Sequence, residues 1–155
     1  MTIFQSPQRV AIALRDDTLT EREKLNFLWV LIALSAIFGE SGILETFRSL
    51  FSVYGLPLLA LWGIPVWGII ASYRVNRQGD NQNFVERFIC LTASLSIRAD
   101  LVYAVLLTLI RFLGSSLLSG WLQFYLAQLV VIGTTLYIYL RLKTLMSIAT
   151  DTANE

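Results

Sequence analysis

The sequence predicts an all-α integral membrane protein, built as a four-transmembrane-helix bundle with an additional short interfacial amphipathic helix. Of its 155 residues, 55% are hydrophobic and only 15% are charged, and the mean hydropathy is +0.63. A soluble domain of this size needs more polar surface than this composition supplies. The apolar runs approach the roughly 20 residues with which a helix crosses the hydrocarbon core. We expect one membrane domain, 21–146, with spans at about 21–38, 56–73, 85–110 and 121–140.

Charge and cysteine content exclude several classes of function. The chain has 12 basic and 11 acidic residues and a formal net charge of +1, so it lacks the basic face typical of a nucleic-acid partner. With one cysteine, Cys90, and no histidine, it has neither an internal disulfide nor the usual soft ligands of zinc, haem or iron–sulfur sites. We therefore expect no metal and no cofactor.

The first 20 residues form a predicted cytoplasmic segment. Ser6-Pro7 has the form of an N-cap followed by proline at the first helical position, which favours a short interfacial helix. The following Val-Ala-Ile-Ala-Leu also suits an extended segment, and both alternatives stay open. These mostly polar residues do not resemble a cleaved signal peptide, so we expect the first span to stay attached as a signal anchor.

A capping box predicts where the first span begins. In this motif the Thr20 hydroxyl accepts from the Glu23 amide, while the Glu23 carboxylate accepts from the Thr20 amide. The helix should begin at Glu21 and end before Gly39, a natural residue for closing a helix. Its length of about 27 Å is just enough to span.

The segment 42–54 changes character. Its apolar residues recur on one helical face, while Glu45 and Arg48 lie on the polar side and can pair at i,i+3. This pattern is typical of an amphipathic helix that lies in the membrane interface. A single helix from Ile43 to Tyr73 would be about 46 Å long and would place both charges in the hydrocarbon core.

The second span, 56–73, contains Pro65, which removes a backbone hydrogen bond and predicts a kink. Trp62 and Trp67 lie near its middle, where packing against other helices explains them better than anchoring at the interface. The polar segment 74–83 that follows should lie in water.

Two interpretations of residues 84–112 stay open. In the first, one tilted helix of about 40 Å crosses the membrane, with Arg98 and Asp100 near its centre. In the second, the N-terminal half is an interfacial or re-entrant segment and the span starts near Arg98. We favour the first, because it leaves Arg111 at a boundary, followed by a loop at 114–116.

The last span, 121–140, has aromatic residues at both ends, as interfacial anchors do, and 147–155 should form a cytoplasmic tail. Glu86 and Arg87 should mark the water interface of the third span. Nine of the 12 basic residues lie on the cytoplasmic side when both termini are cytoplasmic, which satisfies the positive-inside rule. We assume a bacterial inner membrane, because no organellar targeting segment is visible.

The candidate site is a pair of charges within the third span. Ionisable groups at that depth cost about 2.5–3.5 kcal/mol each and normally face protein or water. Arg98 and Asp100 lie about 200° apart on a helix, so each needs its own partner. Tyr103 is within reach of Asp100. Gln123 and Gln128 of the last span are candidates for Arg98, and the five residues together predict an intramembrane polar clamp or polar path.

The sequence predicts function only in outline. With no catalytic constellation, we expect a non-enzymatic assembly or interaction role, as an accessory subunit of a membrane complex or as a homo-oligomer. The expected partners are the lipid bilayer and either another membrane protein or a second copy. The alternative is a small oligomeric channel or transporter in which Arg98 and Asp100 line a polar path.

Overall fold

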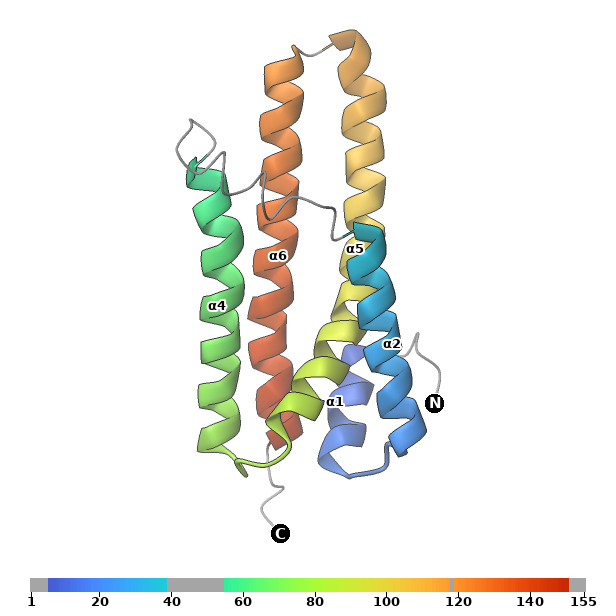
Figure 1. Cartoon of the computed structure of the whole chain (residues 1–155), viewed down its shortest axis with the longest axis vertical. Helices are drawn as coiled ribbons and strands as arrows, with labels where there is room; N and C mark the ends of the chain where they lie inside the picture. Colours follow the sequence, from blue (N-terminus) through green and yellow to red (C-terminus); the bar gives the residue numbers. More distant parts are fainter. Residues whose placement is uncertain (1–5, 39–54, 118, 151–155) are drawn as a thin grey trace.

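The computed structural model describes residues 6–38, 55–117 and 119–150, and every regular element in these ranges is an α-helix (Figure 1). The helices are α1 (Pro7–Arg15), α2 (Glu21–Phe38), α4 (Gly55–Gln78), α5 (Phe84–Leu117) and α6 (Gly120–Thr150). α6 packs against both α4 and α5, while α1 and α2 cover the end of the bundle at which α5 begins. The all-α part of the prediction is confirmed for the described residues.

The prediction of a four-transmembrane-helix bundle is wrong. Among the described residues, two helices are long and apolar enough to cross a membrane, Phe84–Phe112 and Gly120–Thr150. A span needs about 20 predominantly apolar residues. The first turn of α2 is the charged run 21–24, which leaves this helix too few consecutive apolar residues. α4 does not meet the criterion over its described residues. α5 and α6 have the length and the apolar composition of membrane-spanning helices, which supports a membrane location for the protein.

Two predictions concern α4 and the segment before it: the interfacial helix and the kink at Pro65. The interfacial helix predicted at 42–54, with Glu45 and Arg48 on its polar side, lies outside the described residues. Pro65 lies inside α4, which is helical on both sides of it, and the kink expected there stays a prediction.

Local signals at the two N-terminal helices agree with the structure. α1 is helical from Pro7, with Ser6 at the N-cap position, so the helical alternative is right for this segment. The Thr20 amide donates to Glu23 Oε2 at 3.0 Å, and the Glu23 amide donates to the Thr20 hydroxyl at 3.4 Å. This reciprocal pair is the predicted capping box, and α2 begins at Glu21 as expected.

The third predicted span is part of one continuous helix. α5 runs over Phe84–Leu117, so no separate segment precedes Arg98, and the loop expected at 114–116 is helical. The surroundings of the helix nevertheless change near Arg98. Residues 90–96 are all buried, whereas Leu101 is 68% exposed.

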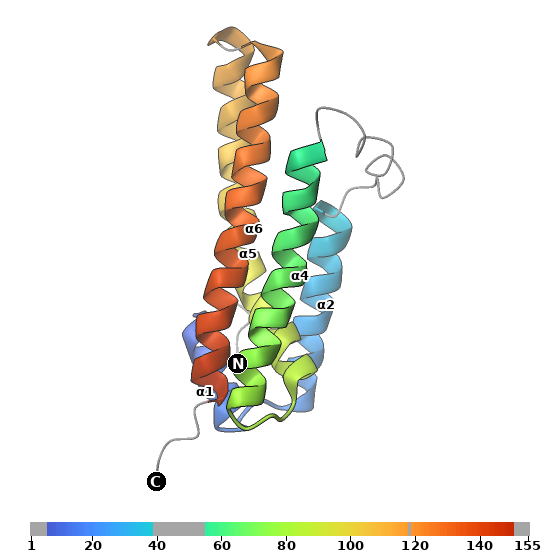
Figure 2. The same cartoon turned by 90° about the vertical axis from the view of Figure 1, so that its left-hand side faces the viewer.

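The hydrophobic core lies at one end of the molecule, where α1, α2, α5 and α6 meet. Its buried members are Val10, Ala11, Ala13, Leu14, Leu19, Phe27, Cys90, Leu91, Ala93, Leu95, Leu142, Leu145, Met146 and Ala149. Beyond this end, α5 and α6 continue side by side past the other helices (Figures 1 and 2). We call the first region the packed end (7–31, 72–97 and 141–150) and the second the apolar pair (99–112 and 120–140).

α4 joins the bundle mainly through α6. Gly68 is buried against Tyr139 of α6, since a Cβ at Gly68 would lie 2.7 Å from the Tyr139 Cβ and closer still to its ring. The missing side chain lets the two helices approach closely. At Gly63, in the same helix, no atom lies within 4 Å of such a Cβ.

We expect Gly68→Ala to destabilise the protein, with Gly63→Ala as the matched control. A methyl group at position 68 must displace Tyr139, and overpacking typically costs about 1–3 kcal/mol. At position 63 the same change meets no atom and gains up to about 1 kcal/mol of helix propensity. The midpoint of thermal unfolding in detergent, followed by circular dichroism, measures both. Equal midpoints for the two variants would contradict the close α4–α6 contact.

Candidate functional site

The five residues of the predicted clamp or path do not gather at one place. Tyr103, Gln123 and Gln128 line one cavity between α5 and α6, with a volume of about 320 Å³. Arg98 is exposed and lines two other cavities. Asp100 is half-buried and lines none of these three cavities. The structure therefore brings three of the five together and separates the two charges.

Arg98 and Asp100 also differ from the expected clamp in their bonding. Within residues 6–38, 55–117 and 119–150, neither side chain forms an ion pair or a hydrogen bond with another described side chain. Both lie on α5 at the border between the packed end and the apolar pair. A clamp that receives them from another chain stays a prediction.

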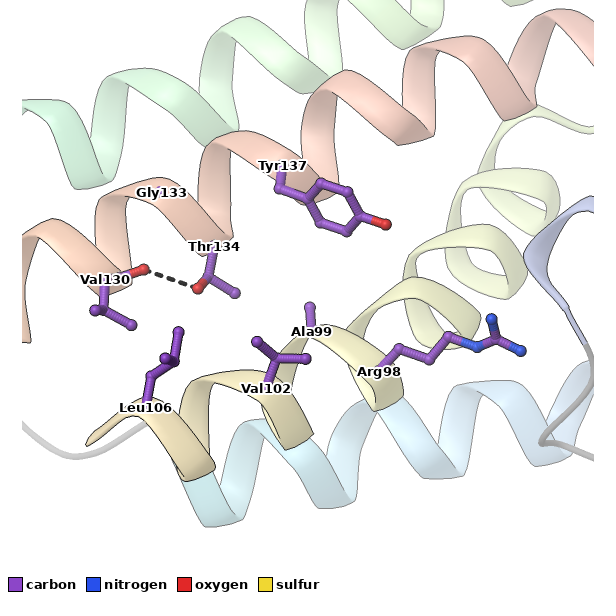
Figure 3. A pocket seen from close by; sticks show the side chains of 8 residues that line it. All are labelled: Arg98, Ala99, Val102, Leu106, Val130, Gly133, Thr134 and Tyr137. Atoms are coloured by element: carbon purple, nitrogen blue, oxygen red, sulfur yellow. Dashed lines mark hydrogen bonds between the residues drawn. The ribbon is translucent and has the colours of Figure 1, made fainter. Parts of the chain in front are cut away.

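The larger cavity at Arg98 is an elongated groove between α5 and α6, with a volume of about 380 Å³ (Figure 3). We call it the apolar groove, and its lining residues are Arg98, Ala99, Val102, Leu106, Val130, Gly133, Thr134 and Tyr137. The Thr134 hydroxyl donates to the Val130 carbonyl at 2.7 Å, so its polar atom is already bonded. The side chains of Arg98 and Tyr137 lie at the same end of the groove, and the Arg98 side chain extends away from the other lining residues (Figure 3).

A second cavity, of about 60 Å³, is formed by α1, α5 and α6. We call it the arginine pocket, and its lining residues are Pro7, Gln8, Leu95, Arg98, Tyr137, Arg141 and Leu145. Arg98 and Tyr137 line both cavities, so the pocket adjoins the polar end of the apolar groove. Two arginines and no aspartate or glutamate line it, an arrangement that favours an anion.

An ion-pair cluster centred on Arg87 lies at the packed end, and it was not predicted from the sequence. Arg87 is 6% exposed and donates to both carboxylate oxygens of Asp80, at 2.5 and 2.6 Å. It also donates to Asn76 Oδ1 at 3.3 Å and to the Gln82 carbonyl at 3.2 Å. Arg87 is therefore buried within the protein, because bidentate pairing and these further acceptors allow its burial. Its expected position at the water interface stays a prediction.

The same cluster corrects the prediction for the polar segment 74–83. Asn76 is 1% exposed, so this segment does not lie wholly in water. The hydrogen bond from Arg87 holds the pKa of Asp80 below its ordinary value, although partial burial opposes the shift. A sequence signal was available: Asp80 lies in the short polar connection between the two helices, and the oppositely charged Arg87 lies in the first turn of the next helix.

A second ion pair joins α2 to α5. Lys24 Nζ lies 2.7 Å from Glu86 Oε1 and 2.9 Å from Glu21 Oε1. The hydrogen bonds to Glu86 and then to Glu21 raise the pKa of Lys24 above its ordinary value. The lysine therefore stays charged at any physiological pH.

Asp80→Asn should lower the free energy of unfolding by about 2–3 kcal/mol at neutral pH, since the buried Arg87 guanidinium loses its counter-charge. The pKa of Asp80 is depressed in the folded protein relative to its ordinary 3.8. Its stabilisation is thus present above that ordinary value and is lost as the pH falls through the folded-state pKa. Unfolding midpoints measured from about pH 3 to about pH 7 should fall at the acid end for the wild type, with a slope that the variant lacks.

Asp16→Asn is the matched control for this substitution. Asp16 pairs with Arg15 at 2.9 Å, with side chains that are 45% and 34% exposed, and exposed pairs contribute only about 0–1 kcal/mol. An equal loss of stability in both variants would show that the buried Arg87–Asp80 pair contributes no more to the free energy of unfolding than an exposed pair does.

Comparison with known proteins adds no family to this description. The chain matches no protein-family model, no curated protein and no solved structure. Its function is therefore inferred from the residues and contacts described above.

Proposed function

We propose that this chain is an integral membrane protein with a non-enzymatic role in assembly or interaction, as an accessory subunit of a membrane complex or as a homo-oligomer. The observation that supports this most is the apolar pair, whose large side chains are exposed rather than packed in a core. The most exposed are Leu101, Val102, Val105, Phe112, Trp121 and Leu129.

Exposure on this scale is unfavourable in water. Burying a leucine or phenylalanine side chain stabilises by about 1.5–3 kcal/mol relative to leaving it exposed. Soluble monomers rarely expose large contiguous apolar patches, and Phe112 and Leu101 are 78% and 68% exposed. Lipid tails, or the apolar face of another membrane helix, remove this cost.

The distribution of basic residues supports a cytoplasmic packed end with both termini in the cytoplasm. The membrane that we propose is a bacterial inner membrane. Of the 12 basic residues, nine belong to α1, the start of α2, the end of α4, the start of α5 or the end of α6. They are Arg9, Arg15, Arg22, Lys24, Arg74, Arg77, Arg87, Arg141 and Lys143. These helix ends meet at the packed end (Figure 1), as the positive-inside rule requires of the cytoplasmic side.

The bonding of the charged groups favours an assembly role over catalysis. Arg87 is bonded to Asp80, and Lys24 to Glu86 and Glu21, so these groups hold helices together. A channel with Arg98 and Asp100 along one path has less support, because Asp100 lines neither of the cavities that Arg98 lines.

Photo-crosslinking in intact membranes tests this proposal. A photoreactive amino acid replaces Leu101 or Leu129, the two most exposed leucines of the apolar pair. In the matched controls it replaces Arg77 or Thr144, which are exposed at the packed end. We expect adducts to a membrane protein or a second copy from positions 101 and 129. The control positions should give few such adducts, because they face water.

Three results would count against the proposal. Recovery of the chain in the soluble fraction after carbonate extraction would contradict the membrane location. Lipid adducts without any protein adduct from positions 101 and 129 would contradict the assembly role. Ion flux through the reconstituted protein that Arg98→Gln changes would favour the channel instead.

A further inference from the structure

We propose that the arginine pocket and the apolar groove together bind one anionic glycerophospholipid. Its phosphate lies between Arg98 and Arg141, and an acyl chain lies along the groove between α5 and α6. This inference rests on the membrane location proposed above, and it adds a ligand class and a site to it.

The charge of the arginine pocket favours a phosphate group as its ligand. Arg98 of α5 and Arg141 of α6 both line it, together with Gln8 of α1 and the Tyr137 side chain. Guanidinium groups offer forked donors that match phosphate oxygens, and an amide and a phenol add neutral donors. No aspartate or glutamate lines either cavity, so no carboxylate of the lining competes for the two arginines.

The two cavities have the sizes that the two parts of a lipid need. A cavity needs roughly 10–15 Å³ of volume to hold one water molecule. The arginine pocket, of about 60 Å³, therefore takes a group of a few heavy atoms, such as a phosphate. The groove is much larger, about 380 Å³, and runs along α5 from Arg98 to Leu106. The eight residue-to-residue rises between them cover about 12 Å, a length suited to part of an acyl chain.

The pocket and the groove lie in the same order along the molecule as the headgroup and the acyl chains of a lipid in a bilayer. On the pocket side lie Leu95 and Leu145, which are buried in the packed end. On the groove side lies Val102, which is 55% exposed in the apolar pair. The phosphate would therefore sit at the border of the packed end and the chain would follow the apolar helices, as in a bilayer. The adjoining apolar groove favours a lipid over free phosphate, because inorganic phosphate has no apolar part that the groove could bury.

Native mass spectrometry of the detergent-purified protein tests the proposal. The added probes are phosphatidylglycerol, phosphatidylcholine with the same acyl chains, and inorganic phosphate. We expect the wild type to retain one phosphatidylglycerol in preference to phosphatidylcholine. Inorganic phosphate at the same concentration should not displace it, because phosphate gains nothing from the groove.

Charge variants test the pocket. Arg98→Gln and Arg141→Gln should each reduce the preference for phosphatidylglycerol by roughly fivefold. Arg98→Lys and Arg141→Lys keep the charge and should retain part of the preference. Arg74→Gln and Arg77→Gln remove the same charge at the exposed end of α4, outside both cavities, and should leave the preference unchanged.

A glycine pair tests the groove independently of charge. Gly133 lines the groove, and a Cβ there meets no atom within 4 Å, as at Gly63 of α4. Gly133→Leu should fit the fold, fill the groove and reduce retention of both lipids. Gly63→Leu adds the same side chain to another exposed helix position and should change neither.

Four results would overturn the proposal: equal retention of both lipids by the wild type, displacement by inorganic phosphate, an unchanged preference after both Arg→Gln substitutions, or unchanged retention in Gly133→Leu. A protein that needs detergent and shows any of these still agrees with the proposed membrane location. A protein that purifies from the soluble fraction instead contradicts the proposed function itself.

Discussion

The buried guanidinium of Arg87 lies where α4 turns back into α5, and an unpaired charge there would cost several kcal/mol. Asp80 supplies the opposite charge through two hydrogen bonds, and Asn76 and the Gln82 carbonyl accept two more. α4 and α5 touch little elsewhere, since both pack mainly on α6. The cluster thereby fixes the turn between them and, with it, the side of α6 on which α4 lies. Lys24 and Glu86 connect α2 to the same end of α5.

This arrangement divides the molecule into two ends with different physical character. The packed end contains the core and the paired charges, whereas the apolar pair exposes large side chains such as Leu101 and Leu129. Arg98 and Arg141 lie at the border between them and line the arginine pocket. The paired charges lie at the packed end, while the two most exposed large apolar side chains, Phe112 and Leu101, belong to the apolar pair. This distribution is the one expected where the apolar pair meets lipid.

The sequence predicted what depends on neighbours along the chain and missed what depends on distant ones. The Thr20 capping box and the start of α2 followed from local hydrogen bonds. Four spans were predicted by counting apolar residues, although the charged first turn of α2 does not fit the count. Burial of Arg87 depended on Asn76 from another helix, which no periodicity reveals. The division of α5 near Arg98 depended on where α1 and α2 pack.

The central claim is that the apolar pair meets lipid while the packed end meets water. Spin labels on single cysteines measure this in a Cys90→Ser background reconstituted in vesicles, at Val105 and Leu129 in the apolar pair and at Arg77 and Lys143 near the packed end. Oxygen should relax the labels at 105 and 129 more strongly than a water-soluble nickel complex does, with the reverse at 77 and 143. Equal access of the nickel complex to all four positions would contradict the account.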